Sequence, residues 1–182
     1  RLIYLKLSIM KTTLRISAGI MLIMALAGCA AQKGGNNTGK STAEEVLYKQ
    51  AIQALDERKF IIEATEFYFP GGKPPTKSET NSQIFMDGNK AVIRFSPDLF
   101  PRSPMDHWNI EDNAAEITKG EHKKNGDIQF CMKIDGAQKW QDKELIIILY
   151  KNTNTCFVHV NGGYSGHNIV DFKGYVYPLA TE

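Results

Sequence analysis

The 182-residue chain is 42% hydrophobic and 23% charged, which is typical of one globular domain and excludes a collagen-like or fully disordered chain. Residues 1–28 carry four basic side chains and no acid, which leaves 18 basic and 20 acidic side chains in the remainder. Because the remainder has no basic excess, the composition does not favour nucleic-acid binding.

The first recognisable pattern is a secretory signal that starts at Met10. Basic Lys11 and Arg15 precede an apolar run over residues 16–26 and then small residues, which is the three-part layout of a leader for export. The run has about 11 residues, fewer than the roughly 20 that a membrane-spanning helix needs. We therefore interpret residues 1–28 as upstream sequence followed by this leader.

The leader ends in Leu26-Ala27-Gly28-Cys29, which resembles the lipobox of bacterial lipoproteins at all four positions. A thiol is nucleophilic enough to accept a diacylglyceryl group as a thioether. The resemblance implies cleavage before Cys29, lipidation of this residue, and attachment to a lipid bilayer through its acyl chains. One acyl chain binds a membrane only marginally, so two or three chains should anchor the protein firmly.

Residues 29–40 are rich in Gly, Asn and Lys and predict a flexible tether. In lipoproteins generally, acidic residues after the cysteine redirect sorting. The tether has none, so we expect the protein on the periplasmic face of the outer membrane. Residues 34–41 fit the P-loop pattern letter by letter, but no hydrophobic strand precedes them, as that motif requires. We therefore predict no nucleotide and no other cofactor.

Residues 41–182 predict a single, mainly β domain with one helix. Ser41 and Glu44 form a capping box at the start of an amphipathic helix over residues 42–58. Alternating apolar and polar residues between turn signals then predict about eight strands, over residues 60–69, 83–86, 91–95, 114–122, 127–135, 144–151, 156–161 and 169–177. Hairpin connections indicate an antiparallel meander that forms a barrel or a sandwich.

The strand over residues 144–151 differs from the others because it is apolar on both faces. Leu145 and Ile147 point to one face, whereas Ile146 and Ile148 point to the other. We therefore predict that the helix lies across the outer face of this strand and covers Ile146 and Ile148.

The order of these elements resembles a known family of bacterial lipoproteins. The lipobox, the helix, Phe60–Ala64, the hairpin at residues 87–91 and the ending at residues 174–179 look like the domain-of-unknown-function 4251 family. This resemblance implies a β-rich lipoprotein and brings no catalytic residues. The segment Pro97–Asn113 is unusual for the family.

The remaining candidates for chemistry are weak. Cys131 falls on the polar face of its strand and Cys156 on an apolar face, with another strand expected between them, so we expect two separate thiols although an exported protein could form a disulfide. The four histidines are scattered without the spacing of metal ligands. Residues 163–167 miss the last glycine of the hydrolase motif G-x-S-x-G, and a strand follows where that motif needs a helix.

The long loop expected over Pro97–Asn113 is the first place to look for a binding surface, because long loops are often functional. In it, Trp108 could form an aromatic platform. Exposed tyrosines on the last strand could form a second platform, although cross-strand packing explains them equally well. The residues of this candidate surface are Asp106, His107, Trp108, Tyr175 and Tyr177.

Together these patterns predict a membrane-anchored periplasmic domain that binds a small ligand or an envelope protein and is not catalytic. One alternative is an envelope glycan hydrolase that uses the loop carboxylates Asp106, Glu111 and Asp112, since such enzymes need two acids facing each other across a gap. Another alternative is a small barrel that carries an apolar ligand inside, which would require a large apolar cavity.

Overall fold

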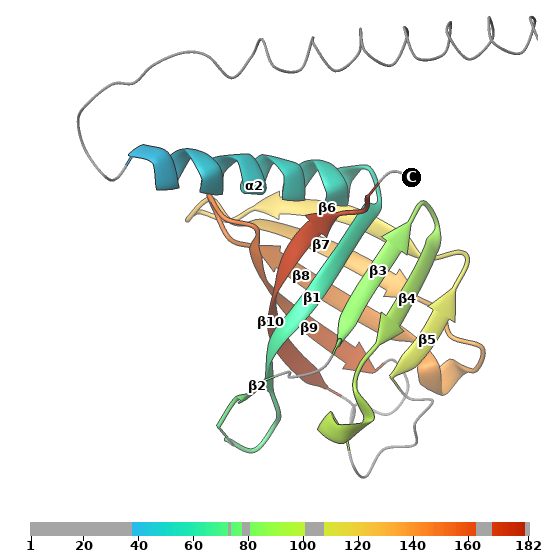
Figure 1. Ribbon diagram of the computed structural model, residues 1–182. Helices are drawn as coiled ribbons and strands as arrows, with labels where there is room; N and C mark the ends of the chain where they lie inside the picture. The colour runs from blue at the N-terminus through green and yellow to red at the C-terminus, as the bar shows by residue number, and fades with distance from the viewer. Residues whose placement is uncertain (1–37, 73, 78–80, 101–107, 163–168, 181–182) are drawn as a thin grey trace, which may run out of the picture. The chain divides into compact units, whose positions relative to one another are not determined.

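The antiparallel strands of the chain form one curled sheet, shown in Figure 1. The structure is a computed structural model. The residues that it describes are 38–72, 74–77, 81–100, 108–162 and 169–180. The predicted leader, Cys29 with most of the predicted tether, Asp106 and His107 lie outside these residues.

The prediction of a mainly β, antiparallel fold with one helix is confirmed. The helix α2 spans Thr38–Asp56, and two 3-10 turns, η2 and η4, span Pro97–Leu99 and Lys139–Gln141. Ten strands lie in the described stretches: β1 (Lys59–Tyr68), β2 (Thr76–Lys77), β3 (Gln83–Asp87), β4 (Lys90–Arg94), β5 (Asn109–Asp112), β6 (Glu116–His122), β7 (Ile128–Ile134), β8 (Lys143–Leu149), β9 (Thr155–Gly162) and β10 (Val170–Pro178).

Two consecutive meanders build the sheet, in which the strand order is β5-β4-β3-β1-β10-β9-β8-β7-β6. The first meander runs from β1 to β5, and the second runs from β6 to β10. They are joined by the antiparallel pair of β1 and β10. The sheet curls into a half-barrel with β5 and β6 at its two edges.

A close approach of two backbones marks the pair that joins the meanders. Ala64 lies opposite Gly174, and the register shifts between Ala64 and Glu66, so one extra residue bends β1 at this point. A Cβ atom on Gly174 would collide with the main-chain oxygen of Glu63. Glycine is therefore required here for space, rather than for an unusual backbone angle.

The helix ends where Arg58 adopts a left-handed backbone with φ of 58°. Arg58 donates from Nη1 to Oδ1 of Asn89 at 3.1 Å, and its carbonyl accepts from the Gly88 N–H at 2.8 Å. At its other end the helix begins at Thr38, so Ser41 lies inside it and the predicted N-cap at Ser41 is wrong. Local capping preferences are weak, amounting to about 1 kcal/mol. No helix in the described stretches is both long and apolar enough to cross a bilayer.

The predicted position of the helix on the outer face of β8 is wrong. Helix α2 packs against β10 and β1 instead, and Figure 1 shows it lying across one open end of the curled sheet. Ala51, Ala54 and Leu55 join the same core as the inward-facing side chains of the strands. Ile146 is 36% exposed on the outer face. The reason is that the curl leaves apolar side chains uncovered at its end, and the helix buries these.

The carboxylate of Asp112 links the end of β5 to the chain just beyond β7. Only residues 113–115 separate β5 from β6, although these strands lie at opposite ends of the strand order. Oδ1 of Asp112 accepts from the N–H of Ala114 at 2.8 Å, and Oδ2 accepts from the N–H of Asp135, just beyond β7, at 2.9 Å. This buried side chain therefore has a structural role.

Candidate functional site

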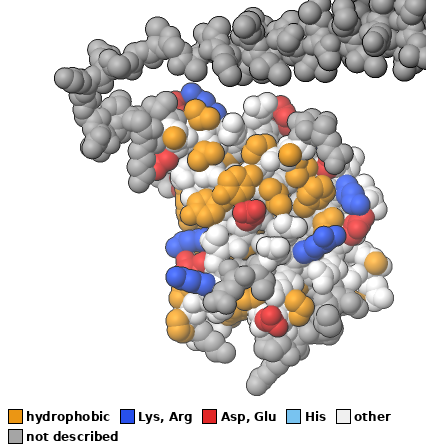
Figure 2. All heavy atoms as spheres, in the orientation of Figure 1, with side chains coloured by type: hydrophobic (Ala, Val, Ile, Leu, Met, Phe, Trp, Pro, Cys, Tyr) orange, Lys and Arg blue, Asp and Glu red, His pale blue; other side chains and the backbone are white. Residues whose placement is uncertain are grey.

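An apolar strip crosses four neighbouring strands on the outer face of the sheet. The cross-strand register places Tyr177, Ile61, Phe85 and Val92 side by side on β10, β1, β3 and β4. Tyr175, the next outward-facing residue on β10, extends the strip, with its ring centroid 6.3 Å from that of Tyr177. We call these five residues the outer strip. Figure 2 shows hydrophobic side chains gathered on this face of the molecule.

Strand periodicity explains why these side chains point outward. Each of three strands carries three consecutive apolar residues, of which the first and third are buried. Ile61 lies between buried Phe60 and Ile62, and Phe85 and Val92 have equivalent neighbours. Successive side chains of a strand point to opposite faces, so the central residue of each triplet must face outward. The two flanking residues already supply the core, and the central one is not needed for it.

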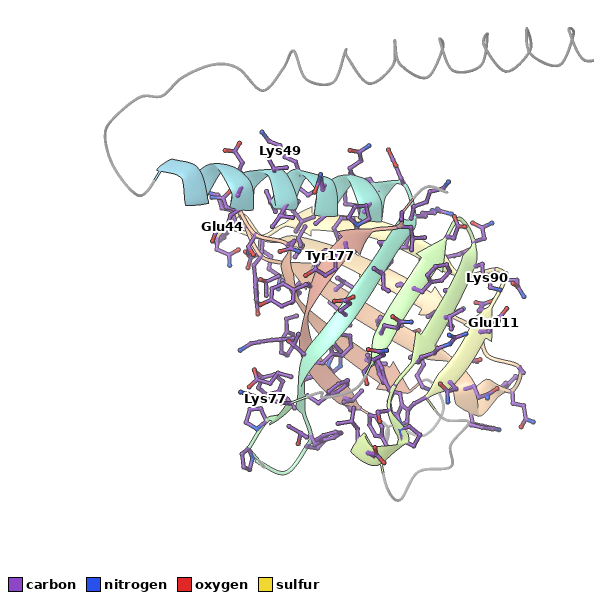
Figure 3. The ribbon with its side chains drawn as sticks, in the orientation of Figure 1. Glu44, Lys49, Lys77, Lys90, Glu111 and Tyr177 are labelled. Atoms are coloured by element: carbon purple, nitrogen blue, oxygen red, sulfur yellow. The ribbon has the colours of Figure 1, made fainter. Side chains whose placement is uncertain are left out.

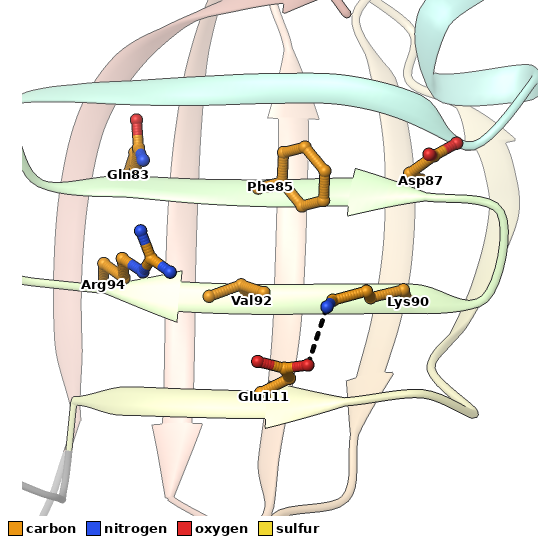
Figure 4. A pocket seen from close by; sticks show the side chains of 7 residues that line it. All are labelled: Gln83, Phe85, Asp87, Lys90, Val92, Arg94 and Glu111. Atoms are coloured by element: carbon orange, nitrogen blue, oxygen red, sulfur yellow. Dashed lines mark ion pairs between the residues drawn. The ribbon is translucent and has the colours of Figure 1, made fainter.

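A hollow of about 300 Å³ lies at the β4 end of the outer strip, over β3, β4 and β5. Phe85 and Val92 form its floor, as Figure 4 shows. One wall is an ion pair between Lys90 Nζ and Glu111 Oε1 at 2.7 Å. Arg94 lies at the other end. The hollow therefore combines an apolar floor with charged walls.

The tyrosines predicted as a second platform lie on the outer face of β10. Tyr175 is 40% exposed, whereas Tyr177 is half-buried and lies below the helix in Figure 3. Burial, followed by the nearby Glu63 carboxylate, raises the pKa of Tyr177. Tyr177 thus packs across the strands against Ile61, whereas Tyr175 is exposed, so each of the two explanations applies to one tyrosine.

Trp108 does not form the exposed platform that we expected. Its side chain is 4% exposed and stacks on Phe100 with ring centroids 4.6 Å apart. The main chain of Trp108 accepts a hydrogen bond from the N–H of Phe95 at 3.0 Å and so extends the pairing of β4 with β5. This pairing turns the indole into the sheet. Aromatic side chains thus fill the interior of the sheet at this end. A barrel that carries an apolar ligand would need this interior space for the ligand.

Lys143, at the start of β8, carries a fully buried ammonium group. Its Nζ donates to the main-chain oxygens of Trp140, Gln141 and Asp142 at 3.3, 3.0 and 3.3 Å, and it lies 5.6 Å from the ring centroid of Trp108. Burial lowers the pKa of Lys143 to about 8, and the Asp142 carboxylate partly opposes this shift. No sequence pattern predicts this buried group, because a single lysine at the start of a strand is usually exposed. All three N–H donors have acceptors, which indicates a structural role.

The lowered pKa of Lys143 predicts a specific pH dependence of stability. Its usual value is 10.5, so between pH 8 and 10.5 the unfolded chain binds more protons than the folded one, and raising the pH in this window favours folding. We expect the free energy of unfolding of the native protein, minus that of Lys143→Met, to rise from pH 8 to pH 10, whichever of the two proteins is the more stable. Urea denaturation would measure both values. The exposed Lys139→Met variant should show no such trend. A value of native minus variant that stays constant or falls between pH 8 and pH 10 would contradict the lowered pKa.

The structure does not bring the predicted loop carboxylates together. Glu111 points outward to Lys90, whereas its neighbour Asp112 is buried on the other side of β5. Two acids on opposite faces of one strand cannot flank a single glycosidic bond. Asp106, the third acid of the hydrolase alternative, lies outside the described residues.

Both cysteines in the described stretches are free, as we expected. Cys131 on β7 is exposed and Cys156 on β9 is buried, with β8 between them. Burial raises the pKa of Cys156 to about 12, so this thiol is unreactive at neutral pH.

His159 lies 2.5 Å from the Asp171 carboxylate on the outer face. Within the described stretches no three His, Cys, Asp or Glu side chains gather as a metal site requires. Residues 163–167 lie outside the described residues.

The chain is therefore a mainly β domain with one curled antiparallel sheet and one helix across the end of the sheet. A crystal structure of a DUF4251 family protein from Bacteroides eggerthii is similar to it, with a TM-score of 0.60 and 18% sequence identity over 76% of this chain and 91% of that chain. This similarity supports the resemblance to that family at the level of the fold. No family model matches the sequence, and no curated protein matches it significantly.

Proposed function

We propose that this chain is an exported lipoprotein whose β domain binds another molecule through the outer strip and catalyses no reaction. Acylated Cys29 would anchor it to the outer membrane, facing the periplasm. The complete lipobox at residues 26–29 supports the anchor. The fold similarity to a protein of unknown function supports the assignment to the same structural class and adds no activity.

The observation that carries the binding role is the position of the outer strip. Ile61, Phe85 and Val92 lie on strands whose inward-facing side chains already form a complete core. Apolar side chains that adjoin across four strands on a water-facing surface are typical of an interaction site, whereas single exposed apolar residues are common and need no explanation. The adjacent tyrosines add rings that favour contact with a partner.

The anchor is tested by the intact mass of the protein purified from native membranes. The chain should begin at Cys29 and carry a diacylglyceryl group with or without a further acyl chain. The Cys29→Ser variant should leave the membrane fraction. An unmodified thiol in the native protein would contradict the anchor, and this result would leave the binding role of the outer strip open to its own test.

The binding role is tested by a photo-crosslinking amino acid placed at Tyr175 or Phe85 in living cells. Both positions should give the same covalent adduct, because the strip is contiguous. Lys133, on the outer face of β7 and away from the strip, provides the matched control position and should give no such adduct. Equal adducts at all three positions, or none at the two strip positions, would contradict the proposal.

A further inference from the structure

A row of hydrogen-bond donors adjoins the apolar floor of the hollow. The register places Gln83 on β3, Arg94 on β4 and Asn109 on β5 directly side by side. All three lie at least partly in solvent. In the part of the chain that the structure describes, the guanidinium of Arg94 makes no ion pair and no side-chain hydrogen bond. Arg94 therefore presents a charge and a planar set of donors that fit a carboxylate.

The charges around the hollow leave Arg94 uncompensated. Glu111 is neutralised by Lys90 at 2.7 Å. Asp87, at the far end, lies between Lys59 and Lys90 in the register. Arg94 has two neutral amides as its cross-strand neighbours. A negative group is therefore favoured over Arg94, and Glu63, which adjoins Gln83 on β1, disfavours a negative group further along that row.

The spacing between the donors and the floor matches an extended peptide. Arg94 and Val92 are two residues apart on one strand and point to the same side, so their side chains are about 7 Å apart. In an extended peptide, side chains two residues apart also share a face at the same spacing. An acidic side chain over Arg94 would thus place the next side chain on that face over Phe85 and Val92.

We propose that the hollow binds an extended peptide segment in which an acidic residue and an apolar residue lie two positions apart. This inference rests on the proposed binding role and names the chemistry of the partner. The carboxylate of the segment pairs with Arg94 and receives further donors from Gln83 and Asn109. The apolar side chain covers Phe85 and Val92, and the Lys90–Glu111 pair closes the far end (Figure 4).

The test uses the full chain in detergent micelles and two fluorescein-labelled peptides, Gly-Asp-Ser-Leu-Gly and its neutral counterpart Gly-Asn-Ser-Leu-Gly, both blocked at their ends. Fluorescence anisotropy should show the acidic peptide binding about tenfold more tightly, as expected for one charge-assisted contact in a solvent-exposed site. Because the side chain of Arg94 is exposed, Arg94→Gln should fold normally. This variant should abolish the preference for the acidic peptide. Val92→Asp should weaken both peptides.

The matched control is Lys133→Gln, which removes one positive charge from the same face of the sheet at a distance from the hollow. It should keep the tenfold preference. Equal affinity of the two peptides for the native protein, or a preference that survives Arg94→Gln, would overturn the inference. In that event adducts formed at Tyr175 and Phe85 in cells would still support the binding role, so the two failures are distinguishable.

Discussion

Replacing Trp108 with alanine is expected to lower the free energy of unfolding by about 3–5 kcal/mol, because it removes a large buried side chain and leaves a cavity. The indole is 4% exposed and lies between Phe100, Phe95 and the Lys143 ammonium group. Urea denaturation followed by circular dichroism would measure the change.

The matched control for this prediction is Tyr175→Ala, which also removes an aromatic ring. Tyr175 is 40% exposed, so the expected loss is below about 1 kcal/mol. A similar small loss for Trp108→Ala would show that the indole does not belong to the core. It would also restore Trp108 as a candidate for the exposed platform that its sequence position suggested.

Replacing Gly174 with alanine is expected to lower the free energy of unfolding by about 2–3 kcal/mol, since overpacking at a fixed backbone contact forces the strands apart. The added Cβ would meet the main-chain oxygen of Glu63 on β1. The pairs of β10 with β9 and of β1 with β3 prevent either strand from moving away. Thermal or urea denaturation would measure the loss.

Gly120→Ala is the control for this prediction because Gly120 also lies in a strand but at the edge of the sheet. A Cβ there would lie 3.2 Å from the main-chain oxygen of Gln129, and among the described strands β6 pairs only with β7, so it is free to shift. We expect a loss below about 1 kcal/mol. A larger loss for Gly120→Ala than for Gly174→Ala would contradict the role assigned to the close approach of β1 and β10.

Much of the fold could be predicted because strand alternation is a local signal. In β7, buried Ile128, Phe130 and Met132 alternate with more exposed residues, as the sequence indicated. Strand β5 was missed because Ile110 is its one strongly apolar residue, so no period could be detected. The pairing of β1 with β10 is a long-range contact, and nothing in either strand alone encodes it.

The position of the helix was mispredicted because an apolar outer face has more than one explanation. The apolar outer positions of Ile146 and Ile148 predict a covering helix, whereas the helix instead packs on β10 and β1 at the end of the curl. The same reasoning, applied to the triplets around Ile61, Phe85 and Val92, would have pointed to the outer strip. That these three residues adjoin could not be derived, because it depends on the register between strands.

The joining of two meanders through the first and last strands has a consequence for folding during synthesis. Residues 59–112 and 116–178 each form a contiguous set of strands, and the pair that unites them brings the N-terminal strand of the domain together with its C-terminal strand. Contacts of such large sequence separation form late and slow the folding of a chain. The β domain therefore cannot complete its sheet until the residues of β10 have left the ribosome, so the two meanders wait for each other during synthesis.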